Sequence, residues 1–196
     1  MQLFSELMLG LKVSIGIAFI SLLIGLIPGA LLFWGKTCKI SIMNALATGI
    51  IELIKGVPIL LLLSFFYFGG YNLNMSGNLS AIVVASVVLA LIAMSEIASK
   101  GHVLAQILNI ELNFRNSVKI LFVTIVRESG RLINYTSLLS IIGINELLRT
   151  AKVISTSEHN SQVFIWAIGI YLCIHIIIKV IYSGLVKGLF STEKTT

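Results

Sequence analysis

The sequence predicts an all-α integral membrane protein with five transmembrane helices, its N-terminus outside and its C-terminus inside. Of its 196 residues, 57% are hydrophobic and only 11% are charged, and the mean hydropathy is +1.02. A soluble domain has roughly 25% charged residues, so this chain has too little polar surface to be solvated as a globule. We expect a single transmembrane domain over residues 1–196, with spans at about 7–34, 57–70, 81–98, 120–144 and 163–185.

The first span is predicted at 7–34, where the apolar run is interrupted only by Lys12 and small polar residues. A helix that crosses a bilayer needs about 20 such residues. The short connection after this run contains Lys36 and Lys39, and short basic loops favour the cytoplasmic side. We therefore expect the N-terminus outside, with the first span retained because the basic region of a signal peptide is absent.

The second span is predicted at 57–70, after a break in the helical pattern. Glu52 and Lys55 lie in a charged turn that ends at Gly56, and Pro58 precedes a long apolar run. Because a proline has no N–H to leave unpaired in a first helical turn, a new helix begins near Pro58. Lys55 can remain among the lipid headgroups. The alternative is an ordinary buried helix that begins with a proline.

The third span, 81–98, returns the chain to the inside and brings Glu96 to the cytoplasmic face. We interpret Glu96 as a solvated residue near a helix end. Residues 99–119 form the predicted cytoplasmic loop, which is the longest polar segment between two spans on the inner side and can reach a cytoplasmic partner. Its charged and titratable residues are Lys100, His102, Glu111, Arg115 and Lys119.

The fourth span, 120–144, contains three charged residues, Arg127, Glu128 and Arg131. Charges inside a membrane are costly unless they are paired or hydrated, so these side chains should face the bundle interior or an aqueous path. Glu128 and Arg131 are three residues apart and therefore share a helical face. Two interpretations stay open: an ion pair that holds two helices together, and a role in a transport path.

The last span, 163–185, contains His175 and Lys179 one turn apart. A local hydrogen-bonding arrangement near a helix end is the simpler interpretation, and a proton relay is the alternative. Residues 144–162, before this span, are polar and mildly amphipathic. They predict a short helix on the external surface.

Other features argue against several classes of function. The net charge of +6 is concentrated in short connections, which is typical of a membrane protein rather than of a nucleic-acid-binding face. Cys38 and Cys173 have no second cysteine at metal or redox spacing. The sequence contains no GK[ST] phosphate loop, no HExxH and no nucleophile elbow. We therefore expect no catalytic residue, no metal site and no bound cofactor in this chain.

Three motifs occur in order: GLKVS at 10–14, ELIKGVP at 52–58 and TSLLSIIGINEL at 136–147. They resemble motifs of the inner-membrane permease subunits of ATP-binding-cassette (ABC) importers for polar amino acids, the histidine/glutamine type. The second is similar to the family's E-L-(F/I)-(R/K)-G-(T/V)-P signature, and the third to its T-S-L-x-S-x-I-G-x-x-E-L. The order and spacing of the motifs agree with the family over most of the chain.

The resemblance implies the fold of a type I ABC importer permease and transport of a polar or charged amino acid across the cell inner membrane. The family pairs such a chain with a second permease, a P-loop ATPase dimer that uses ATP, and an external solute-binding protein. The alternative is a non-transporting membrane scaffold or regulatory subunit that has the permease fold. An ion-coupled carrier that uses His175, Lys179 and the charges of the fourth span is a third hypothesis.

The resemblance also assigns residues to roles. Those at the translocation path or gate are Arg127, Glu128, Arg131, Ser137 and Glu146. Those with a structural role in the motifs are Glu52, Lys55, Gly56, Pro58 and Gly143. Glu128 matches the Glu of the family's N-E pair, whose Asn is replaced by Arg127 here.

One segment departs from the family. The family's cytoplasmic coupling loop carries E-A-A, then a Gly and I-x-L-P, and forms a short helix that docks into the ATPase. Between residues 100 and 123 this chain has none of these features, and the interval is about a dozen residues shorter than the family pattern. Glu111 and Arg115 remain available for contacts with an ATPase. Either a different partner permease bears the intact loop, or this subunit couples weakly or not at all.

Overall fold

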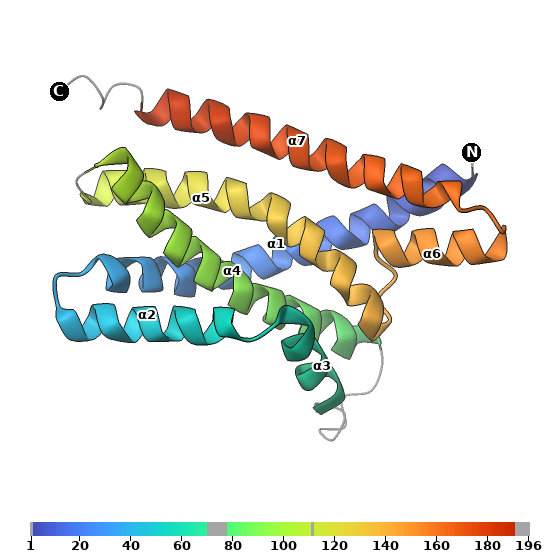
Figure 1. Cartoon of the computed structure of the whole chain (residues 1–196), viewed down its shortest axis with the longest axis horizontal. Helices are drawn as coiled ribbons and strands as arrows, with labels where there is room; N and C mark the ends of the chain where they lie inside the picture. Colours follow the sequence, from blue (N-terminus) through green and yellow to red (C-terminus); the bar gives the residue numbers. More distant parts are fainter. Residues whose placement is uncertain (1, 70–77, 111, 191–196) are drawn as a thin grey trace.

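The computed structural model describes residues 2–69, 78–110 and 112–190, and this part of the chain is helical apart from short connections (Figure 1). The elements are α1 (Gln2–Thr37), α2 (Ser41–Gly56), α3 (Ile59–Gly69), α4 (Asn78–Leu108), α5 (Phe114–Tyr135), the 3-10 helix η2 (Thr136–Ile142), α6 (Leu147–Ser157) and α7 (Gln162–Phe190). In Figure 1 the C-terminal ends of α1, α4 and α7 lie at one end of the bundle, with the starts of α2 and α5. α6 lies at the opposite end, near the start of α1.

α1 and α4 pack against each other more extensively than any other pair in the described part and form the centre of the bundle. A Cβ on Gly25 would lie 2.7 Å from the carbonyl oxygen of Ala90, and a Cβ on Gly29 would lie 3.1 Å from Met94 Cα. Small residues allow membrane helices to approach this closely. Gly25 and Gly29 therefore have a packing role, unlike Gly16, where a Cβ would meet nothing within 4 Å.

Three helices of the described part, α1, α4 and α7, are long and apolar enough to cross a membrane. They correspond to the predicted spans at 7–34, 81–98 and 163–185. The predicted span at 57–70 is shorter than expected, because α3 has 11 residues and reaches about half of the hydrocarbon thickness. α2 and α3 are bent by 82° where they meet, and together they are long and apolar enough to form one broken span.

The segment predicted as the fourth span, 120–144, is divided between two elements. α5 begins earlier than predicted and ends at Tyr135, and η2 continues the chain to Gly143, whose φ of 88° ends it. α5 is not among the helices apolar enough to qualify as a span, because its charged residues lower its hydropathy. Five spans and the orientation of the termini stay predictions.

Most of the described residues of the predicted cytoplasmic loop at 99–119 are helical. α4 continues to Leu108 because its apolar face continues: Leu104 is buried in the same cluster as Phe33 of α1. α5 begins soon afterwards, so the connection between the two helices is limited to residues 109–113. The polar residues of this segment are therefore compatible with a helix, because its apolar face is buried against α1.

Candidate functional site

Charged side chains from α2, α4 and α5 form one connected group, which we term the Glu96 network. Its members are Lys55, Glu96, Lys100, Glu128 and Arg131. The Glu96 carboxylate is at the centre, 3.1 Å from Arg131 Nη1. It also lies 3.5 Å from Lys100 Nζ and 3.5 Å from Lys55 Nζ. A single carboxylate, with only 14% of its side chain exposed, therefore forms ion pairs with cations from three helices.

Glu128 is the most deeply buried member of the network, with 2% of its side chain exposed. Its Oε2 accepts a long hydrogen bond of 3.5 Å from Arg131 Nη1, as its position one turn before Arg131 predicts. Its Oε1 has no hydrogen-bond partner within the described residues. A buried carboxylate oxygen without a donor is costly, so Glu128 retains the capacity to accept one further hydrogen bond.

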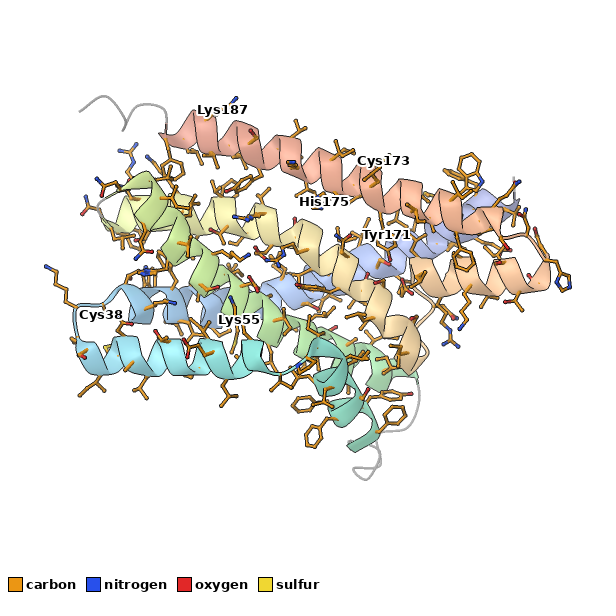
Figure 2. The ribbon with its side chains drawn as sticks, in the orientation of Figure 1. Cys38, Lys55, Tyr171, Cys173, His175 and Lys187 are labelled. Carbon is orange, nitrogen blue, oxygen red and sulfur yellow. The ribbon has the colours of Figure 1, made fainter. Side chains whose placement is uncertain are left out.

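Two members of the network lie in surroundings different from those predicted. Glu96 is not a solvated residue at a helix end, because α4 extends well beyond it and packs it against α5. Lys55 does not only reach the headgroups: its ammonium group pairs with Glu96 and donates a hydrogen bond to Ser99 of α4. Figure 2 shows Lys55 between α2 and α4. The basic residue of the ELIKGVP motif therefore ties the end of α2 to the centre of the bundle.

Glu146 organises a second group of polar contacts, the Glu146 cap, at the start of α6. Its carboxylate accepts hydrogen bonds from the backbone N–H groups of Leu148 at 2.8 Å and Arg149 at 2.7 Å, which caps the helix. The hydroxyl of Tyr171 in α7 donates a third bond at 3.1 Å. Burial raises the pKa of the Glu146 carboxyl, and the two backbone donors act in the opposite direction. Leu147 N–H donates to Ser14 of α1.

The third motif therefore acts as a joint between α1, α6 and α7. Arg149 Nη1 donates to the carbonyl oxygen of Ser140 at 3.0 Å, across the turn made by Gly143. Gly143 takes a left-handed conformation that favours glycine. Ser137, predicted at the path or gate, donates to the carbonyl oxygen of Asn134 at 2.8 Å, within its own chain segment. The structure does not bring Ser137 and Glu146 together with the Glu96 network.

A cavity of about 550 Å³ lies between α5 and α7. Its lining residues are Arg127, Gly130, Arg131, His175, Ile178, Lys179 and Tyr182. The Arg127 guanidinium lies 5.6 Å from the centre of the Tyr182 ring, which holds it at the wall. We term this feature the α5–α7 cavity. It brings together the two arginines of the fourth predicted span and the His175 and Lys179 pair of the fifth.

The remaining predicted residues lie outside these groups. Glu52, Gly56 and Pro58 are exposed, and they mark the break where α2 ends and α3 begins. Arg115 is exposed in the first turn of α5, beside the short α4–α5 connection. Glu111 lies outside the described residues.

Sequence reasoning did not identify Glu96, Lys100 or Tyr171 as parts of a site. Glu96 and Lys100 could have been found, because an i, i+4 pair of opposite charges at the end of an apolar run indicates a shared helical face. Tyr171 carries no such signal. Its partner, Glu146, is 25 positions away in the sequence, and only the packing of α7 on α6 brings them together.

Comparisons with known proteins agree with this architecture. No family model matches the chain. The chain is 22% identical, over 195 aligned positions that cover 91% of it and 88% of the relative, to a putative glutamine transport system permease protein, GlnP, of Rickettsia conorii. It also matches a chain in the crystal structure of an amino acid ABC transporter with histidines, with a TM-score of 0.76, 19% identity and 92% of each chain covered. The chain therefore has the fold of an ABC transporter permease and resembles the permeases of polar amino-acid ABC transporters along nearly its whole length.

Proposed function

We propose that this chain is the transmembrane permease subunit of an ATP-driven importer for a polar or charged amino acid, in the cell inner membrane. The observation that carries the proposal is the likeness of fold, which covers 92% of the chain. The amino-acid specificity is supported by the similarity to a protein described as a glutamine permease.

A permease of this kind forms the translocation path with a second permease and works with an ATPase dimer and an external solute-binding protein. We propose that the ATP is bound and hydrolysed by the ATPase, while this chain binds no cofactor and catalyses no reaction. Its own contribution is the path and the conformational change. That division of labour agrees with the charged residues of the Glu96 network, which join helices, and with those that line the α5–α7 cavity.

The Glu96 network fits such a conformational change. Lys55 lies at the end of α2, next to the 82° bend that joins it to α3, and Arg131 lies on α5. Because Glu96 has three cationic partners, it can lose one of them when the helices move and still be neutralised. We propose that the network keeps α2, α4 and α5 together while the permease changes between its two states.

The short connection between α4 and α5 favours a second candidate, the scaffold or regulatory subunit. Residues 109–113 leave no room for a separate helix between the two elements, and a coupling helix is what docks an ATPase in the family. Within the first proposal, a different partner permease supplies the intact coupling loop. The two candidates therefore differ in whether an ATPase accompanies this chain at all.

Affinity purification of the tagged full chain from a gentle detergent tests both candidates. The co-purifying proteins would be identified, their ATPase activity assayed, and amino-acid uptake measured after reconstitution into proteoliposomes. We expect a P-loop ATPase, a second permease and ATP-dependent uptake. Recovery of membrane partners without an ATPase would instead support the scaffold. A Glu96→Gln variant should reduce uptake, and Glu52→Gln, which changes an exposed glutamate on α2, serves as the matched control.

A further inference from the structure

The α5–α7 cavity opens to the surface of the described part of the chain, where Arg127, His175 and Lys179 are exposed, and it has an unusual balance of charge for a site beside a helix apolar enough to span a membrane. Its walls carry Arg127, Arg131, Lys179 and His175, and no carboxylate is among its lining residues. Its volume of about 550 Å³ lies within the roughly 300–1,000 Å³ typical of small-molecule sites. A cavity of this size with only basic and neutral walls favours an anionic occupant.

The cations differ in how far the protein itself neutralises them. Arg131 pairs with Glu96 at 3.1 Å and Glu128 at 3.5 Å, so its charge is balanced. Within the described part of the chain, neither Arg127 nor Lys179 forms an ion pair with a carboxylate. Among the described residues, two cations at the cavity therefore have no directly paired carboxylate.

The position of these residues makes the imbalance costly. Lys179 and His175 lie near the middle of α7, a helix apolar enough to span a membrane, and Figure 2 shows His175 there, with α5 alongside. Uncompensated charges at such depth are retained at substrate or ion pathways. Tyr182 holds Arg127 by its ring face, which leaves the guanidinium N–H groups free to bind a planar, bidentate acceptor such as a carboxylate.

We propose that the α5–α7 cavity binds a small solute with more carboxylates than cationic groups, with Arg127 and Lys179 as its direct ligands. An acidic amino acid is the member of this class that agrees with the proposed permease function. The statement that the bound solute is transported rests on that proposed function. A neutral amino acid brings only one carboxylate and therefore leaves one of the two cations without a carboxylate partner. A basic amino acid adds a further positive charge.

Equilibrium binding to the full chain, purified with its partners and placed in phosphatidylcholine nanodiscs, tests this proposal. The probe is radiolabelled L-glutamate, and the competitors are L-glutamine, which has nearly the same shape without the side-chain charge, and L-lysine. We expect glutamate to bind and the competitors to be about tenfold weaker or more, since a charged hydrogen bond is lost. Lys179→Met and Arg127→Met should each weaken glutamate binding by about tenfold. Lys187→Met, in the same helix but outside the cavity, should leave it unchanged.

The outcomes separate this proposal from the proposed function. Three results would overturn the anionic site. They are equal binding of glutamine and glutamate, absence of glutamate binding, and unchanged glutamate binding in both cavity variants when their size-exclusion profiles are normal. Loss of glutamate binding when phosphatidylglycerol replaces phosphatidylcholine would also overturn it, because a lipid headgroup would then be the occupant. Glutamate binding without ATP-dependent uptake of any amino acid would overturn the permease function and leave the site intact.

Discussion

Glu96 and Glu146 are both carboxylates at contacts between helices, but their partners are of different kinds. The half-buried Glu96 joins α2, α4 and α5, and the buried Glu146 joins α6 to α7. Glu146 accepts from two backbone N–H groups and one tyrosine hydroxyl, all within 3.1 Å. Glu96 is surrounded by the flexible side chains of Arg131, Lys100 and Lys55. Backbone donors fix the position of a carboxylate, whereas long cationic side chains can follow a moving helix. The Glu146 cap therefore acts as a rigid joint and the Glu96 network as an adjustable one.

The largest expected effect comes from removing the central charge of the adjustable joint. Glu96→Gln keeps the shape of the side chain but leaves three cations with one carboxylate, Glu128. Breaking a largely buried ion pair costs about 3–5 kcal/mol, and Glu96 is 14% exposed. We expect a marked fall in the thermal unfolding temperature measured in detergent. Adding Lys55→Met to this variant should restore part of the loss, because one unpaired cation is removed.

The control for that experiment is Glu52→Gln, which alters an exposed glutamate on α2 and should change the unfolding temperature little. Equal losses in Glu52→Gln and Glu96→Gln would show that the network does not hold the helices together. No recovery in the double variant would show that its cations act independently of Glu96.

The contact between α1 and α4 carries no charge and tests the packing on which both joints depend. The Glu146 cap is bonded to Ser14 of α1, and Glu96 lies on α4. Gly25→Ala would place a Cβ 2.7 Å from the carbonyl oxygen of Ala90, so α1 and α4 must separate. Overpacking of this kind costs about 1–3 kcal/mol. Gly16→Ala, where a Cβ meets nothing within 4 Å, is the matched control and should be close to wild type in thermal unfolding. A similar loss in both variants would argue against close packing at Gly25.

The rigid joint is broken by Glu146→Ala, which removes the cap of α6 and the acceptor of Tyr171. Loss of an N-cap costs about 0.5–2 kcal/mol. The free energy of unfolding should fall by that amount, and proteolysis should become faster in α6 before it does in α4. Glu158→Ala at the exposed end of the same helix is the control. If both substitutions had the same effect, the cap would have no particular role.

The smallest expected effect is a pH dependence at Glu146. Because burial raises the pKa of this carboxyl above its ordinary value of 4.5, the folded state binds its proton more tightly than the unfolded state does. The resulting stability is present below the ordinary pKa and is lost as the pH rises through the folded pKa. Between about pH 4 and pH 7, wild type should lose stability relative to Glu146→Gln, as measured by unfolding at each pH. A gain instead would show that the backbone donors dominate.

Much of the fold was predictable because apolar runs and helix breaks are patterns of neighbouring residues in the sequence. The apolar runs at 7–34, 81–98 and 163–185 indicated three helices that are apolar enough to cross a membrane. The Gly56 to Pro58 break indicated the bend between α2 and α3. The helical conformation of most described residues at 99–119 was not predicted, because the burial of a polar segment's apolar face depends on its neighbour, here α1.

The sequence by itself determined that this is a membrane protein resembling an ABC permease, since hydropathy and the three motifs are read along the chain. It also showed that charges lie inside predicted spans, but not what they contact. The tertiary structure alone decided that Glu96 pairs with Arg131, 35 positions away, and that Arg127 and Lys179 line one cavity. The physical reason is that ion pairs between helices depend on their packing and rotation, which no local pattern specifies.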